Sequence, residues 1–144
     1  MFRKIVVAYN QTAEAQRALA SAIQLAKSLD AELLTVTVMV DLPSYTAFAS
    51  VADPALPRVL DEDRLRGYSE LENKARVQAE SHGIRFEAHL LDGKPVEAIV
   101  EFLRHHRADL LVIGLHQREF YIARLWSTVY ELAQDAPCSV LGVH

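Results

Sequence analysis

The chain has 144 residues, of which 51% are hydrophobic and 24% are charged. This length fits one domain with a full hydrophobic core, and the composition excludes a disordered chain. Fifteen Lys and Arg residues against nineteen Asp and Glu residues give a net charge of -4, which disfavours nucleic acid and anionic membranes as partners. We therefore expect a single domain over residues 1–144 that binds neither nucleic acid nor a membrane.

Cysteine content and apolar runs bear on the compartment. The single cysteine, Cys138, cannot form a disulfide within the chain, so nothing indicates an oxidising compartment. The apolar run near the N-terminus is too short for a signal peptide, and no later run reaches the roughly 18 residues of a membrane span. We expect a cytoplasmic protein.

Strand and helix patterns alternate from the start of the chain. A continuous apolar run from Ile5 to Tyr9 predicts a strand that is buried on both faces. Thr12 suits the N-cap of an alanine-rich amphipathic helix that reaches Leu29, and residues 33–40 predict a second buried strand. Residues 41–61 contain three prolines, so we expect a variable excursion that neither a helix nor a strand crosses intact.

The same alternation continues to the end of the chain. A helix over 61–81 would place Leu65, Tyr68, Leu71 and Ala75 along one side. Thr128 and Glu131 form a capping-box pattern that predicts the start of a short last helix. The other predicted elements are a strand over 84–91, a helix from Pro95, a strand over 110–114 and a strand over 140–143.

This order of elements predicts a mostly parallel, doubly wound α/β sheet with helices on both faces. Ligands bind to such sheets beyond the carboxyl ends of the strands, where the strand order reverses. If the first strand pairs with the fourth, residues 10–12 face residues 114–116, and residues 117–126 fold over this crevice. No glycine-rich fingerprint follows the first strand, which excludes a Rossmann dehydrogenase and a Walker-type NTPase.

Several short segments are typical of one family. They are the opening strand at 4–8, Ala31-Glu32-Leu33, Gly93-Lys94-Pro95, residues 108–114 and residues 136–141, of which the last two are the most specific. With these segments in this order, the chain resembles the universal stress protein family over essentially its whole length. The resemblance implies a Rossmann-like sheet of five strands in the order 3-2-1-4-5.

Nucleotide-binding members of that family carry a Gly, two residues, a Gly, nine residues and a Gly followed by Ser or Thr, with an Asp ending the first strand. The corresponding residues here are Gly114, Gln117, Ser127 and Thr128, and Asn10 replaces the Asp. Gln117 is expected to obstruct the close approach of backbone amides to phosphate that a glycine permits. Asn10 keeps an acceptor but lacks the negative charge that an Asp presents to ribose hydroxyls. The nucleotide motif is therefore eroded.

The candidate ligand-binding residues lie at these motif positions and at neighbouring strand ends. Ser127 and Thr128 either cradle a phosphate or cap the last helix, and capping is the simpler interpretation. Arg118 either clamps a phosphate or is simply solvated. The full candidate set is Asn10, Thr12, Val38, Gly114, Gln117, Arg118, Ser127 and Thr128.

Neither a catalytic residue nor a metal site is indicated. Adjacent His105 and His106 would point about 100° apart on a helix, so they would not hold one ion together. Cys138 has no basic neighbour in the sequence that would activate its thiol. His116 is the one histidine near the predicted crevice.

The resemblance implies a dimeric, cytoplasmic stress-response module that binds or protects without turnover, needs no cofactor and is not a typical ATP binder. A first alternative is a sensor that binds ATP, AMP or a cyclic nucleotide through side chains at the crevice. A second is a slow nucleotide-hydrolysing or nucleotidyl-transfer enzyme that uses His116. The apolar last strand favours a homodimer, because an open edge strand needs a partner. Its predicted interface residues are Val140, Leu141 and Val143.

Overall fold

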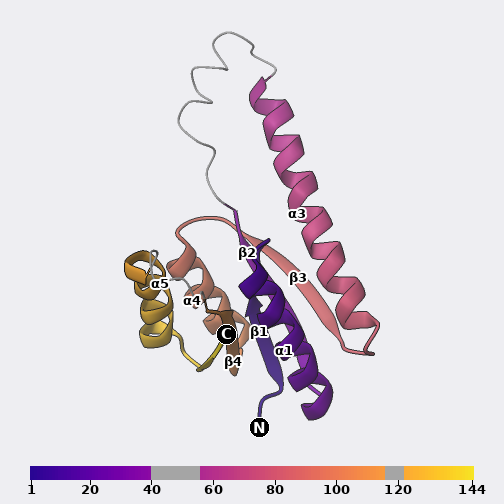
Figure 1. Cartoon of the computed structure of the whole chain (residues 1–144), viewed down its shortest axis with the longest axis vertical. Helices are drawn as coiled ribbons and strands as arrows, with labels where there is room; N and C mark the ends of the chain where they lie inside the picture. Colours follow the sequence, from indigo (N-terminus) through magenta and orange to yellow (C-terminus); the bar gives the residue numbers. More distant parts are fainter. Residues whose placement is uncertain (40–55, 116–121) are drawn as a thin grey trace.

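The computed structural model describes residues 1–39, 56–115 and 122–144, with side chains at 1–39, 62–115 and 128–144 (Figure 1). In chain order the elements are β1 (Lys4–Ala8), α1 (Ala13–Leu29), β2 (Glu32–Val38), α3 (Leu56–Glu80), β3 (Phe86–Leu91), α4 (Pro95–His106), β4 (Leu110–Gly114), α5 (Ile122–Asp135) and β5 (Ser139–Val143). Within the described residues, no helix is both long and apolar enough to span a membrane.

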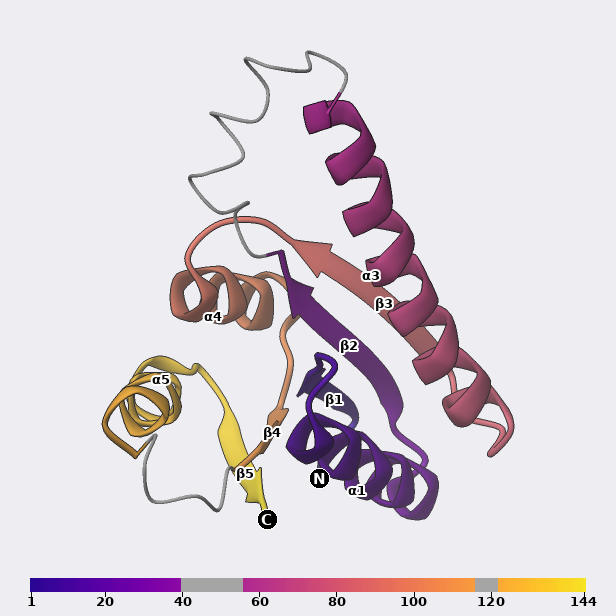
Figure 2. The ribbon, with the colours of Figure 1, turned by 45° about the horizontal axis from the view of Figure 1, so that its top comes forward.

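The strands form one sheet in the order β3-β2-β1-β4-β5, and every neighbouring pair is parallel. The predicted strand order is confirmed. Helices α1 and α3 cover one face of the sheet, and α4 and α5 cover the other (Figure 2). The order reverses between β1 and β4, so the carboxyl ends of these two strands define the switch point.

Alternating residues of the central strands fill the two cores. Ile5 and Val7 of β1 pack with α1 and α3, whereas Val6 between them packs with α4 and α5. Each of these side chains is fully buried. Such two-sided burial explains why the strands are continuous apolar runs in the sequence.

Several predicted boundaries are confirmed. Thr12 is the N-cap of α1, and its hydroxyl accepts a hydrogen bond of 3.2 Å from the Ala15 amide. Pro95 begins α4, where a missing N–H costs no helical hydrogen bond. Strand β4 has the predicted bounds, Leu110 and Gly114.

The start of α3 differs from the prediction. The helix begins at Leu56 rather than Asp61, so the last residues of the predicted excursion are helical, and residues 41–55 lie outside the described ones. Pro57 is tolerated because it falls in the first helical turn. Leu65, expected on the buried side, is 53% exposed, because the core-facing row is Leu71, Ala75 and Ala79.

The capping-box prediction at Thr128 is wrong. Helix α5 begins at Ile122, so Thr128 and Glu131 lie inside the helix. Ile122, Leu125, Val129 and Leu132 recur at helical spacing, and this longer amphipathic pattern outweighs the local capping signal.

Candidate ligand-binding site

A cavity of about 870 Å³ lies at the carboxyl ends of β1, β2 and β4, at the switch point of the sheet. The first turn of α1, the N-terminal half of α3, the start of α4 and the body of α5 complete its walls. Five of the predicted ligand-binding residues line it: Asn10, Thr12, Val38, Gly114 and Thr128. Gln117 and Arg118 lie outside the described residues, and Ser127 lies in α5 with its side chain outside them.

The deep walls of this cavity are apolar. Val36 and Val38 come from β2, and Ile113 comes from β4. The helices contribute Leu71 from α3, Ile99 from α4, and Val129 and Leu132 from α5. Walls of this kind, with a few polar groups at the rim, suit the flat apolar part of a small molecule.

Asn10, at the rim, is engaged by its own chain. Its Oδ1 accepts hydrogen bonds from the Thr12 amide at 2.9 Å and from the Thr12 hydroxyl at 2.5 Å. An amide NH₂ cannot accept a hydrogen bond from a backbone N–H, so this contact also fixes which atom is the oxygen. Asn10 therefore offers a ligand chiefly its two N–H donors, which corrects the expectation that it serves as an acceptor.

Thr12 is engaged in the same network. Its hydroxyl donates its one proton to Asn10 and accepts from the Ala15 amide, as the N-cap of α1. The first role of Thr12 is to hold the turn between β1 and α1.

Tyr9 and Thr37 also line the cavity, although they were not among the predicted site residues, and their hydrogen bonds hold the chain that leads into this turn. The buried Thr37 hydroxyl donates to the Tyr9 carbonyl at 2.9 Å, and the Tyr9 amide donates to the Val36 carbonyl at 2.9 Å. The Tyr9 hydroxyl accepts from the Gln16 side-chain amide at 2.8 Å. Burial raises the pKa of the Tyr9 phenol, and the bond from Gln16 opposes this shift.

Gly114 has a packing role of its own. A Cβ at this position would overlap the backbone of Glu14 and Ala15 in the first turn of α1. A glycine is therefore required for β4 to end this close to α1, whatever the cavity binds.

The α5 end of the cavity differs from a phosphate cradle. Only the first four N–H groups of a helix lack an intrahelical partner. Helix α5 begins at Ile122, so the amides of Ser127 and Thr128 lie beyond that first turn. These two amides are positioned for helical hydrogen bonds rather than for an anion.

The charges around the cavity are mixed. Among the described lining residues, Glu14 and Asp63 carry carboxylates and Arg64 carries a guanidinium. Asp63 also lies 3.7 Å from the guanidinium of Arg66, one turn further along α3. The described lining thus has no excess of positive charge.

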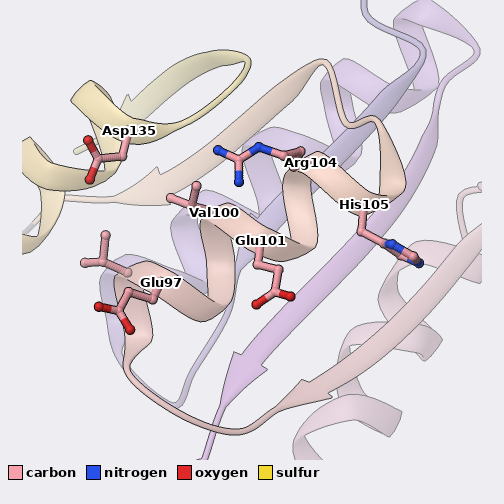
Figure 3. A pocket seen from close by; sticks show the side chains of 7 residues that line it. Glu97, Val100, Glu101, Arg104, His105 and Asp135 are labelled. Atoms are coloured by element: carbon pink, nitrogen blue, oxygen red, sulfur yellow. The ribbon is translucent and has the colours of Figure 1, made fainter.

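A smaller depression of about 550 Å³ lies between α4 and the end of α5 (Figure 3). Its polar residues, which include Glu97, Glu101 and His105, are exposed on the outer side of α4. None of its described lining residues comes from a strand and none is a predicted site residue, so the cavity at the switch point is the candidate site.

A model of the universal stress protein family matches residues 1–144. The chain belongs to this family. A universal stress protein of Thermus aquaticus is 31% identical over 148 residues, with 99% of both chains covered. A family member from Burkholderia pseudomallei, whose crystal structure is known, is 26% identical with a TM-score of 0.73, covering 99% of this chain and 96% of that one.

A universal stress protein crystallised in complex with cAMP shares the fold, with a TM-score of 0.75 at 24% identity and coverage of 99% and 97%. The family predicted from the sequence is confirmed, and so is the Rossmann-like α/β fold.

Metal and thiol chemistry find no support in the described part of this universal stress protein. Within that part, no group of three or more His, Cys, Asp or Glu side chains is arranged to hold a metal ion. Burial, and secondarily the Asp109 carboxylate, raise the pKa of the Cys138 thiol, which is the opposite of activation. His116 lies outside the described residues.

The predicted interface residues lie on β5, at the edge of the sheet. Val140 and Val143 are half-buried and pack against the two cores of their own chain, while Leu141 is 37% exposed. Of the three, Leu141 is the most available to a partner.

Proposed function

We propose that this universal stress protein is a binding module that acts without turnover, and that its cavity takes a nucleoside or a cyclic nucleotide rather than ATP. The observation that carries the proposal is the combination of apolar walls with a described lining that has no excess of positive charge. A purine ring suits such walls, whereas a triphosphate needs several positive or N–H groups.

The size of the cavity supports a ligand of this class. Its volume of about 870 Å³ falls within the range of small-molecule sites. A relative with the same fold binds cAMP. The N–H donors of Asn10 at the rim can meet the oxygen atoms of a sugar or of a cyclic phosphate.

Two features argue against the phosphate mode of the family's ATP binders. Gln117 stands where a glycine would let backbone amides approach phosphate oxygens. The amides of Ser127 and Thr128 are placed within α5, past its free N-terminal turn. We infer that the motif positions have become scaffold.

We propose that the protein acts without turnover because of the side chains that line its cavity. Its described lining contains no His, Lys or Cys, the side chains that most often act as bases or nucleophiles. The carboxylates of Glu14 and Asp63 are the acidic groups there.

We further propose a cytoplasmic homodimer that pairs through β5. The single cysteine fits a reducing compartment. Strand β5 lies at an edge of the sheet and presents Leu141, so a second copy of β5 is a suitable partner.

Calorimetric titration with adenosine, cAMP and ATP tests the ligand. We expect saturable binding of adenosine or cAMP and at least tenfold weaker binding of ATP. Val38→Trp should abolish binding, because the indole ring would occupy the cavity beside its apolar wall. Val77→Trp is the matched control and should leave binding unchanged, because Val77 is exposed on α3 and does not line the cavity. A flat titration with adenosine and cAMP, or tighter binding of ATP, would refute the proposal.

A further inference from the structure

One wall of the cavity is a row of residues on α3. Gly67, Leu71, Ala75 and Ala79 follow one another at four-residue spacing, so they lie on one side of the helix. Leu71, Ala75 and Ala79 are buried in the core beneath α1 and α3. The N-terminal part of α3 extends past the carboxyl ends of β2 and β3 (Figure 1), and Gly67 is one of the residues that line the cavity.

Nothing in the described fold explains a glycine at this position. Glycine is among the least favourable residues in a helix interior, and Gly67 lies in the middle of the 25-residue α3. Its backbone φ angle is not positive, and a Cβ built there would meet no heavy atom of the described residues within 4 Å beyond its chain neighbours and the adjacent backbone of its own helix. Gly114 contrasts with it, because packing against α1 forbids a side chain at that position.

We propose that Gly67 is a specificity-determining position, where the missing side chain leaves room for the planar base of the ligand to lie against α3. The inference rests on the proposed function and adds the wall that receives the base. Leu71, one turn further along the helix, lines the same cavity, as do the neighbouring Arg64 and Tyr68. A planar ring can approach a helix backbone closely only where a side chain is absent.

A side chain at position 67 should raise the stability of the protein while it weakens the binding of the ligand. Gly67→Ala should raise the melting temperature by about 3 °C, because alanine favours the helix and meets no described atom. The same change should weaken binding of adenosine or cAMP about threefold, and Gly67→Leu should weaken it more than about tenfold. Ser69→Leu is the matched control, since Ser69 is exposed and points about 200° away around the helix.

The results distinguish the two proposals. If the wild-type protein binds neither adenosine nor cAMP, both proposals fail. If the wild type binds and Gly67→Leu binds equally well, the role of Gly67 is refuted and the proposed function stands. A fall in melting temperature for Gly67→Ala would also refute this role, because the glycine would then serve packing. Equal losses of affinity for Gly67→Leu and Ser69→Leu would have the same meaning.

Discussion

Two threonines on the same face of β2 offer a matched test of what a buried hydroxyl contributes. Thr35 is 1% exposed, and its Oγ1 has no hydrogen-bond partner among the described residues. Thr37 is 3% exposed, and its Oγ1 donates to the Tyr9 carbonyl at 2.9 Å. The same substitution, Thr→Val, should therefore change stability in opposite directions at these two positions.

The expected magnitudes follow from the hydroxyl partners. Thr35→Val removes an unpaired polar atom and buries one more methyl group, so we expect about 1 kcal/mol of stabilisation after some strain from the larger group. Thr37→Val removes a hydrogen bond and leaves the Tyr9 carbonyl without that donor, so we expect about 1–2 kcal/mol of destabilisation. The melting temperature should rise by about 3 °C in the first variant and fall by about 3–6 °C in the second.

Urea unfolding followed by circular dichroism, with thermal melts in parallel, measures both changes. The m-value should stay constant, so that a shifted midpoint reports stability alone. Similar destabilisation of both variants would refute the reasoning, because steric strain from the methyl group would then outweigh the hydroxyl partners at both positions.

Three further changes test the edge strand, a buried phenol and the rim of the cavity. Leu141→Glu places a charge on the edge strand, so sedimentation should show a monomer where the wild type is a dimer; an unchanged dimer contradicts pairing through β5. Burial raises the pKa of Tyr9, so its stabilising contribution is complete below about pH 10, where the unfolded phenol ionises, and is lost as the pH rises through the folded pKa. Unfolding free energies measured above pH 10 should therefore fall more steeply for the wild type than for Tyr9→Phe, and parallel curves would exclude this contribution. Asn10→Asp keeps an oxygen on the Thr12 amide but removes the two N–H donors that we propose for the ligand's oxygen atoms, so calorimetry should show about tenfold weaker binding of adenosine or cAMP; unchanged or tighter binding would contradict a role for these donors.

The fold was predictable because its central strands carry their signal locally. Residues 110–114 form a continuous apolar run, and the strand has these bounds. The predicted alternation of strands and helices also placed the switch point correctly. Parallel strands buried on both faces leave this pattern whatever their distant partners are.

Helix starts were less predictable, since a local capping signal competes with longer amphipathic patterns. Thr128 and Glu131 satisfy the capping-box spacing, yet they lie within α5 because Val129 and Leu132 continue an apolar stripe that begins at Ile122. A hydroxyl three residues before a glutamate marks a helix start only where the chain before it is not itself helical.

The α3 wall of the cavity had no signal that sequence reasoning could use. Asn10 follows β1, and α1, β2 and the segment after β2 separate it in the sequence from Gly67 and Leu71, which line the same cavity. The spacing of residues within one loop motif gives no information about residues so far away in the sequence. A single glycine in a predicted helix is also too common to indicate a site. Only the position of α3 beyond the strand ends brings these residues to one cavity (Figure 1).

Gly114 and Gly67 line the same cavity but differ in the reason for a glycine at each position. Gly114 occupies a position of the family's phosphate motif, and its packing against Glu14 and Ala15 is sufficient reason for a glycine there. Gly67 belongs to no motif and lowers the helix propensity of α3, and among the described residues the structure shows no packing reason for a glycine there, although it lines the cavity. Under the proposed function, the eroded motif position Gln117 is separate from the apolar walls of the cavity, which come from β2, β4 and the helices. Loss of the motif predicts a change of ligand class rather than the loss of binding.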